Sequence, residues 1–287
     1  MKWFWVQNML INYLRSARRI ATILFTRSAY GRQYLLRRAL KSSQRHTHPI
    51  DVTYSIQTSG FIPNFLSDPG VNIAKIVSRE NNHYAGCQPS CLRKALRSLP
   101  DTNKFAFYDL GCGMGRALVV ASEFPFREIV GVDLSKELCA IATKNAQKIA
   151  QSFPDRAQIS VEQGDATAIA LGGDRIVVFM YHSFGRTTLT PIINRLEQLV
   201  KAGRDVFIIF ENPVNGDLVE QSIYFSRWYA EQVPGDSDEI GHHSDVDDGV
   251  VVWRSVNAMP AQRSGHQDFK IVITKPTWRA EVVRSDR

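Results

Sequence analysis

The sequence feature that most constrains the fold is a set of three glycines at alternate positions, Gly111, Gly113 and Gly115. The apolar run Phe105–Tyr108 precedes them and is typical of a buried strand. The segment Arg116–Glu123 follows them and has the pattern of a helix. Glycine lets the backbone approach a ligand closely and take positive φ angles. We therefore predict a strand–turn–helix unit of the kind that opens nucleotide-binding α/β folds.

The residues around these glycines indicate which ligand the turn would hold. A nicotinamide dinucleotide requires Gly-x-Gly-x-x-Gly or -Ala, and the last position is Arg116 in this chain. Asp109, close to the turn, would repel a pyrophosphate. S-adenosylmethionine has no phosphate and carries a sulfonium and an ammonium group, so a nearby carboxylate would attract it. The charges favour S-adenosylmethionine and argue against a nucleotide-binding oxidoreductase.

Two further acidic residues follow predicted strands. Glu128–Asp133 is the second predicted strand, and its last residue lies about 20 positions after the first glycine, where a carboxylate would meet a ribose diol. The third predicted strand, Ile159–Gln163, leads to Asp165, which can accept a hydrogen bond from an adenine amine. Taken alone, Asp165 reads as an ordinary turn residue. Three strand-end acids in register with a glycine turn favour a binding site.

The segments Asp109–Gly115, Gly131–Asp133 and Gly164–Ala166 resemble the first three motifs of class I S-adenosylmethionine-dependent methyltransferases. The resemblance covers roughly residues 84–210. It implies an α/β fold, a Rossmann-like doubly wound seven-stranded sheet, here with an N-terminal helical extension. It also implies that the chain transfers a methyl group from S-adenosyl-L-methionine to an acceptor.

A closer resemblance involves three other segments: Asp51–Phe65, Tyr84 with Gln88-Pro89, and Ala121–Asp133. They are similar to a group of mostly uncharacterised bacterial methyltransferases. That group is distantly similar to protein lysine methyltransferases of the histone H3 lysine-79 type and to mitochondrial lysine methyltransferases. This resemblance says little about the acceptor, which is a protein lysine, another amine or a different group.

The family resemblance also implies a cofactor site. It assigns the methionine part to Asp109 and the glycine turn, and the ribose hydroxyls to Asp133. It places Leu134 against the adenine, and Tyr84 with Gln88 over the methionine end as a lid. The implied cofactor-binding residues are Tyr84, Gln88, Asp109, Gly111, Cys112, Gly113, Gly115, Asp133, Leu134, Asp165, Ala166 and Tyr181.

The candidate catalytic residues are Tyr181 and His182, which follow the fourth predicted strand, Arg175–Met180. Related enzymes often carry Asn-Pro-aromatic in this loop, and this chain has His182-Ser183-Phe184 instead. A histidine there can be a general base, because its ordinary pKa lies near neutrality, or a residue satisfied by a backbone partner. No metal is expected, because the sulfonium is already an activated donor. The altered loop keeps open a catalytically inactive module that binds the cofactor.

The other predicted elements complete such a sheet. Ser135 is predicted to cap a helix over 136–150, and a second helix is predicted over 187–202. A fifth strand is predicted over 205–210 and a helix over 217–227. The segments 228–233 and 249–255 are predicted to form the antiparallel pair that closes the sheet. The apolar alternation Phe269–Lys275 has no assigned place.

Two groups of residues could hold a metal ion or form disulfides, but the spacing of neither supports such a site. The loop Pro234–Asp248 contains the residues His242, His243, Asp245, Asp247 and Asp248, whose spacing matches no metal site, so we expect a solvated acidic loop. The four cysteines, Cys87, Cys91, Cys112 and Cys139, form no Cys-x-x-Cys pair. Their pattern is consistent with a reducing, cytoplasmic compartment.

The N-terminal segment differs from the rest in charge. The first fifty residues contain ten Lys and Arg residues and no acid, although the net charge of the whole chain is only +7. Trp3 and Trp5 lie in an apolar run that Asn8, Asn12 and Arg15 interrupt, so it is too short to cross a bilayer. Peripheral contact with an anionic membrane, a mitochondrial targeting segment, nucleic-acid contact and a helical cap with a solvated basic side all stay open.

We predict four regions along the chain. Residues 1–48 form the basic amphipathic extension, and residues 49–100 form the lid and cap of the catalytic domain. Residues 101–256 form the methyltransferase domain. Residues 257–287 form a C-terminal tail with a possible extra strand.

Overall fold

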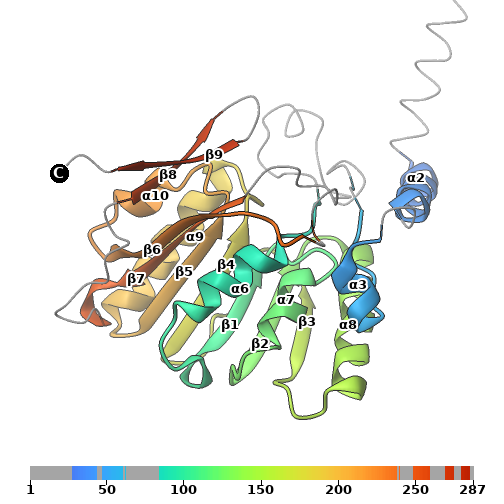
Figure 1. Ribbon diagram of the computed structural model, residues 1–287, viewed down its shortest axis with the longest axis horizontal. Helices are drawn as coiled ribbons and strands as arrows, with labels where there is room; N and C mark the ends of the chain where they lie inside the picture. The colour runs from blue at the N-terminus through green and yellow to red at the C-terminus, as the bar shows by residue number, and fades with distance from the viewer. Residues whose placement is uncertain are drawn as a thin grey trace, which may run out of the picture.

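The centre of the protein is a seven-stranded sheet with the strand order β3-β2-β1-β4-β5-β7-β6 (Figure 1). The structure is a computed structural model, and it describes residues 28–43, 47–60, 62, 84–237, 239, 248–258, 269–274 and 279–284. The strands are β1 (Ala106–Leu110), β2 (Glu128–Asp133), β3 (Ile159–Gln163), β4 (Arg175–Tyr181), β5 (Asp205–Glu211), β6 (Phe225–Val233) and β7 (Asp248–Ser255). Strands β1 to β5 are parallel, and β7 runs antiparallel to both β5 and β6.

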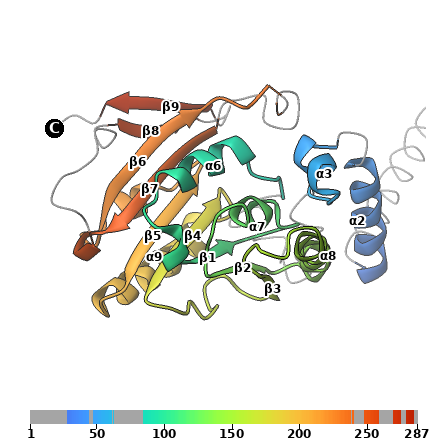
Figure 2. The ribbon, with the colours of Figure 1, turned by 60° about the horizontal axis from the view of Figure 1, so that its bottom comes forward.

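Helices cover both faces of this sheet, as a doubly wound fold requires (Figure 2). One face packs against α6 (Pro89–Arg97), α7 (Arg116–Ala121) and α8 (Lys136–Ser152). The other packs against α9 (Arg186–Lys201) and α10 (Asp217–Glu220). Two 3-10 helices, η1 (Thr102–Lys104) and η2 (Val256–Ala258), complete the described core. The predicted Rossmann-like seven-stranded α/β fold is confirmed.

The alternating pattern of the strands separates the two cores. Side chains such as Phe107, Phe179 and Ile209 pack toward α6 and α7, whereas Tyr108 and Ile208 pack toward α9. Successive side chains of a strand point to opposite faces, so one apolar run contributes to both cores. This is why the parallel strands read as nearly continuous hydrophobic segments in the sequence.

Most predicted elements are confirmed to within a few residues, and Ser135 caps α8 by accepting a hydrogen bond from the Leu138 N–H at 3.3 Å. The predicted helix over 217–227 is wrong beyond Glu220. Phe225 already starts β6, because the segment pairs with β7 as far as Val233. A register shift between Arg227 and Tyr229 disturbs its alternation, so the segment does not show a regular strand pattern.

The C-terminal alternation forms a strand outside the main sheet. β8 (Phe269–Thr274) pairs in an antiparallel manner with β9 (Arg279–Arg284). This two-stranded sheet lies beside β6 and β7 (Figures 1 and 2). The extra strand predicted in the tail is therefore present.

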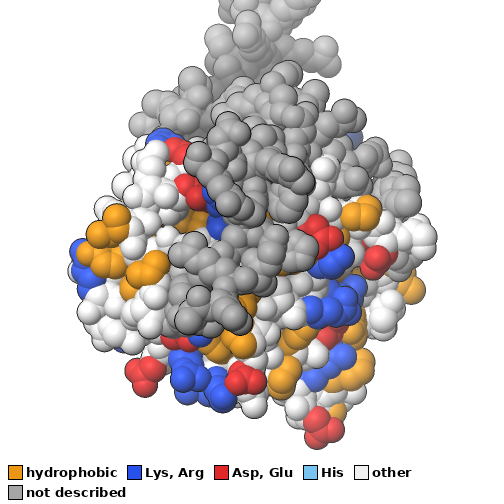
Figure 3. Space-filling view, turned by 60° about the vertical axis from the view of Figure 1, so that its left-hand side comes forward, with side chains coloured by type: hydrophobic (Ala, Val, Ile, Leu, Met, Phe, Trp, Pro, Cys, Tyr) orange, Lys and Arg blue, Asp and Glu red, His pale blue; other side chains and the backbone are white. Residues whose placement is uncertain are grey.

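The N-terminal extension is described from Ser28 onward, so Trp3 and Trp5 lie outside the described residues. Helix α2 (Ala29–Ser43) buries Leu36 against Leu138 of α8, as a helical cap would. Helix α3 (Pro49–Tyr54) follows it. Over the described part of the chain, no helix has the length and apolar character to cross a membrane. On the face drawn in Figure 3, basic and acidic side chains are interspersed among the described residues.

Candidate active site

The glycine turn brings together three parts of the chain. Gly111, Gly113 and Gly115 have φ angles of 83°, 53° and 84°, which residues with a side chain rarely adopt. A Cβ atom on Gly113 would lie 2.2 Å from the Tyr84 ring, and one on Gly111 would lie 2.8 Å from the Ser183 Oγ. The segment before α6 and the loop after β4 therefore both lie directly on the turn. Their roles as a lid and an acceptor loop stay predictions.

Asp133 connects the turn to the start of α8. Its carboxylate accepts hydrogen bonds from the Gly113 N–H at 2.9 Å and from the Ser135 N–H at 2.8 Å. Asp109 is buried, and burial raises the pKa of its carboxyl group well above the ordinary value, while the Asp133 carboxylate raises it further. The structure thus brings the first two strand-end acids close together.

The third strand-end acid lies in a tight turn. Asp165 Oδ1 accepts hydrogen bonds from the Thr167 N–H and from its hydroxyl, both at 2.8 Å. Ala166 is buried, and Leu134 is 41% exposed, so an apolar surface is available beside β2. These contacts agree with Asp165 as an ordinary turn residue, and the role of Asp165 toward adenine stays a prediction.

Tyr84 and Gln88 are placed differently. The Tyr84 hydroxyl donates to the Thr58 carbonyl at 2.6 Å, which holds the ring over Gly113. The Gln88 amide donates to the Ser90 hydroxyl and to the Val233 carbonyl, so it is bonded within the protein toward β6. Tyr84 thus lies where a lid residue would, and a role for Gln88 in cofactor binding stays a prediction.

A buried polar cluster that the sequence analysis missed holds the N-terminal segment on the turn. We call it the Asp51 cluster, and its members are Asp51, Thr58, Ser59, Tyr84 and Arg116. The Asp51 carboxylate accepts from the backbone N–H groups of Thr58 and Ser59, both at 2.8 Å, and from both of their hydroxyls. All four of these hydrogen bonds end on one buried carboxylate.

Arg116 completes the Asp51 cluster from the other side. Its Nε donates to the Thr58 hydroxyl at 2.8 Å, and its two terminal nitrogens donate to the carbonyls of Thr58 and Cys87. Arg116 is the residue that breaks the dinucleotide spacing, and that departure was the available signal for a special role. Asn145 adds a second clamp, because its amide bonds the backbone of Gln57 and the Met114 carbonyl.

The candidate catalytic residues end β4. His182 has a left-handed backbone with φ of 40°, and Tyr181 is partly buried. Burial raises the pKa of the Tyr181 hydroxyl well above its ordinary value, and the carboxylates of Asp248 and Glu211 raise it further. Tyr181 therefore stays protonated at neutral pH. The Ser183 hydroxyl donates to the Tyr181 carbonyl at 3.0 Å and shapes this loop.

A second missed feature lies next to Tyr181. Glu211, at the end of β5, pairs in register with Tyr181, and its side chain is fully buried. Asp248, expected in a solvated loop, is instead buried as the first residue of β7, and this corrects that expectation. Its Oδ1 accepts a hydrogen bond from the Asn212 amide at 2.6 Å. We refer to Glu211 and Asp248 as the Glu211 pair.

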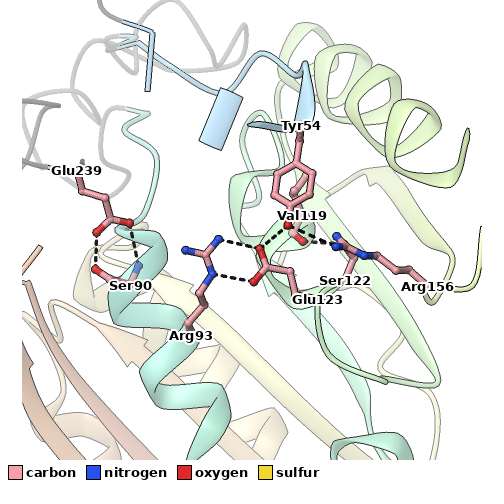
Figure 4. Close-up of polar contacts among 8 residues, drawn as sticks. All are labelled: Tyr54, Ser90, Arg93, Val119, Ser122, Glu123, Arg156 and Glu239. Carbon is pink, nitrogen blue, oxygen red and sulfur yellow. Dashed lines mark hydrogen bonds and ion pairs between the residues drawn. The ribbon is translucent and has the colours of Figure 1, made fainter. Parts of the chain in front are cut away.

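An outer network supports the helices that carry these clusters (Figure 4). The Glu123 carboxylate pairs with the Arg93 guanidinium at 2.7 Å and accepts from the Tyr54 hydroxyl at 2.9 Å, which links α6 and α3 to the turn after α7. The Glu239 carboxylate accepts hydrogen bonds from the Ser90 N–H and hydroxyl at the start of α6.

The described residues contain no group of three or more His, Cys, Asp or Glu side chains that could hold a metal ion. His242, His243, Asp245 and Asp247 lie outside them. All four cysteines are free thiols and are buried.

A family model described as a methyltransferase domain matches residues 107–203. The match spans the glycine turn, Asp133, Asp165 and the loop after β4. It supports the resemblance to class I S-adenosylmethionine-dependent methyltransferases at this general level. No curated protein sequence matches the chain significantly.

Solved structures of methyltransferases are similar to the chain at low identity. The ribosomal protein L11 methylase of Lactobacillus delbrueckii subsp. bulgaricus is 15% identical, with 59% of this chain and 79% of that chain covered and a TM-score of 0.42. Magnesium protoporphyrin IX methyltransferase of Synechocystis PCC 6803 is 13% identical, with 58% and 77% covered and a TM-score of 0.43. Phosphoethanolamine N-methyltransferase 1 of Haemonchus contortus is 15% identical, with 63% and 45% covered and a TM-score of 0.42. Similarity at this level carries no argument about the acceptor.

Proposed function

We propose that the protein is an S-adenosylmethionine-dependent methyltransferase. The observation that carries this proposal is the glycine turn with Asp109 and Asp133 beside it, inside the segment that matches a methyltransferase domain. The buried acid Asp109 suits a cation, because a nearby positive charge would offset the cost of ionising it. S-adenosyl-L-methionine supplies a methyl group already activated by its sulfonium.

The protein's own residues would bind the cofactor, orient it toward the acceptor and exclude water. Asp133 lies at the carboxyl end of β2, where it can meet a ribose diol. The Tyr84 ring lies against Gly113 of the turn. Holding donor and acceptor in line can contribute about 7–11 kcal/mol in ideal cases. His182 is the candidate base for the acceptor's proton, and His182→Ala should lower kcat with little change in cofactor affinity.

The finer proposals concern acceptor and location. We propose an amine acceptor, such as a protein lysine, because the bacterial group that the chain resembles is distantly similar to lysine methyltransferases. We also propose that the basic extension binds anionic membranes. In the described part of the extension, Tyr30 and Tyr34 are exposed beside Arg37 and Arg38 on α2. Sedimentation with anionic vesicles should retain the full chain but not a chain that starts near Thr47, and equal recovery of both in the supernatant would exclude the membrane role.

Calorimetry with S-adenosylhomocysteine tests the proposed function. The wild type should bind it, and Asp133→Ala should weaken binding about tenfold to a hundredfold, because hydrogen bonds to a charged group are lost. Asp155→Ala, at an exposed acid in the loop after α8, is the matched control and should bind like the wild type. Absence of wild-type binding, or tight binding of a nicotinamide dinucleotide, would refute the proposal.

A second experiment distinguishes an enzyme from an inactive cofactor-binding module. Purified protein is incubated with cell lysate and methyl-labelled donor, and mass spectrometry locates the labelled acceptor. Cofactor binding together with no transfer to any lysate component would favour the module.

A further inference from the structure

The carboxyl ends of β1, β4 and β5 and the adjacent start of β7 place a row of polar side chains on one face of the sheet. The row consists of Asp109, Tyr181, Glu211 and Asp248. Each member lies two residues from a side chain of the core beneath α6 and α7, namely Phe107, Phe179, Ile209 and Val250. Residues two apart in a strand share a face, so all four polar side chains point to the same side. The row leads from the cofactor turn to the Glu211 pair.

Glu211 is the member whose surroundings are incomplete. Its Oε1 accepts a hydrogen bond from the Gln88 N–H at 2.8 Å. Its Oε2 is buried, and no N–H or O–H donor among the described residues reaches it. Buried polar atoms of native proteins nearly always have a partner, and a bound ligand or ion is one explanation for an exception.

Asp248 supplies a second carboxyl group beside the first. Burial raises the pKa of Glu211 well above its ordinary value, and the Asp248 carboxylate raises it further. Two neighbouring carboxyl groups do not both ionise unless a cation lies between them, so without one the pair shares a proton. The shared proton leaves the pair with one negative charge in the protein interior.

Two residues beside the pair have a left-handed backbone. His182 and Asn212, the residues that follow β4 and β5, have φ angles of 40° and 48°. Such left-handed conformations of non-glycine residues cluster at functional sites. Asn212 is fixed by three hydrogen bonds to Asp248 and Gly249, one from its backbone and two from its side chain. The chain thus fixes one oxygen of each carboxyl group, through Gln88 and through Asn212.

We propose that Glu211 and Asp248 bind the cationic nitrogen of the methyl acceptor, which is therefore an amine. This inference rests on the methyltransferase function proposed above. Ammonium N–H groups would donate to Glu211 Oε2 and to Asp248, and would thus replace the shared proton as the partner of these oxygens. Tyr181 lies in register with Glu211 and leads directly into the loop beside the glycine turn.

The pair can also accept the acceptor's proton. When an ammonium ion binds, it displaces the shared proton to solvent, since its charge favours two ionised carboxylates. One ammonium proton then passes to the pair, which leaves a neutral amine with a free electron pair. The nitrogen attacks the methyl carbon, the carbon–sulfur bond breaks, and the sulfur keeps its electrons as a neutral thioether. The methylated ammonium product leaves the pair singly protonated, so one proton is released per turnover.

In this inference the Glu211 pair, and not the neighbouring His182, takes the acceptor's proton. The two thiols and the tyrosine hydroxyl around the pair cannot act as the base. These groups are Tyr181, Cys87 and Cys91, and the charged residues nearby are Glu239 and Arg116 of α7. Burial raises the pKa values of the two thiols and of the Tyr181 hydroxyl, and the nearby carboxylates raise them further. The two thiols and the Tyr181 hydroxyl therefore stay protonated at neutral pH. The Glu239 carboxylate accepts from the Ser90 N–H at the start of α6.

The experiment measures binding of n-butylammonium to the full-length protein by calorimetry, with and without S-adenosylhomocysteine. n-Butanol is the uncharged comparison ligand. The variant is Glu211→Gln, which keeps the size of the side chain and an oxygen for the Gln88 N–H. The matched control is Glu128→Gln, at an exposed acid that begins β2 at the amino ends of the parallel strands. Asp248→Asn is used in its place if circular dichroism shows that Glu211→Gln does not fold.

We expect the wild type to prefer n-butylammonium over n-butanol by about tenfold or more, and Glu211→Gln to lose this preference. The control should behave as the wild type does. Titration in phosphate and in HEPES buffer should show one proton released per ammonium bound. Equal ammonium binding by wild type and Glu211→Gln, no ammonium binding, or no proton release overturns the inference. Absence of S-adenosylhomocysteine binding instead overturns the proposed function, and the two failures are therefore distinguishable.

Discussion

The Asp51 cluster and the Glu211 pair are both buried and acidic, yet they are built in opposite ways. The Asp51 carboxylate accepts four hydrogen bonds from Thr58 and Ser59. Glu211 accepts one, from Gln88, and its second oxygen is left without a donor among the described residues. A carboxylate surrounded by donors stabilises the fold, whereas one left short of donors weakens it. The contrast separates an acid that holds structure from one that is available to a ligand.

Asp51→Asn should change the free energy of unfolding more than the other substitutions do. The amide presents its own N–H groups to donors that now bond a carboxylate, so the free energy of unfolding should fall by about 2–4 kcal/mol. Urea denaturation measures it, with Asp155→Asn on the exposed loop after α8 as the control. If Asp51→Asn were as stable as that control, the Asp51 cluster would not be what holds the N-terminal segment.

Glu211→Gln should raise the free energy of unfolding, and the size of this increase should depend on pH. The folded protein holds the Glu211 proton more tightly than the unfolded chain does, because the folded-state pKa is raised above the ordinary 4.5. Between pH 4.5 and the raised pKa, the free energy of unfolding of the wild type therefore falls as pH rises, by up to about 1.4 kcal/mol per pH unit. Below pH 4.5 this contribution is constant.

The glutamine variant lacks this titration. Its stability advantage over the wild type should grow from pH 4.5 to 7, and denaturation at several pH values measures the difference. Glu128→Gln, which removes an exposed acid at the start of β2, serves as the control. Parallel pH profiles for wild type and Glu211→Gln would contradict the raised pKa.

Tyr84→Phe should give the smallest effect. It removes the hydroxyl that donates to the Thr58 carbonyl but keeps the ring on Gly113. We expect a loss of about 0.5–1.5 kcal/mol in the free energy of unfolding. Tyr30→Phe, on an exposed ring of α2, is the matched control. A larger loss than that of Asp51→Asn would place the hydroxyl, and not the carboxylate, at the centre of the cluster.

The half of the sheet around the glycine turn was predictable because its signals are local. Apolar runs such as Glu128–Asp133 and Ile159–Gln163 end at turn residues, so their bounds could be read directly. The family motifs lie in these same segments. The helix predicted over 217–227 failed because the pairing of Phe225–Val233 with β7 is decided by contacts with a distant strand.

Both buried acidic clusters were missed for the same reason. Thr58 reaches Arg116 over 58 positions, and Gln88 reaches Glu211 over 123 positions. No local pattern marks such partners. Asp248 was misjudged because its neighbours in the sequence are polar, whereas its neighbours in space are β5 and β6.

The hydrogen bonds between Gln57 and Asn145 have a consequence for the order in which the protein is made. The two residues are 88 positions apart, so the ribosome adds Asn145 roughly 4–18 s after Gln57 at ordinary synthesis rates. During that interval the segment that closes the glycine turn has been synthesised but has no clamp to receive it. Contacts this distant in the chain also form slowly once both partners exist. The turn is therefore covered late, after the helix that carries Asn145 has emerged.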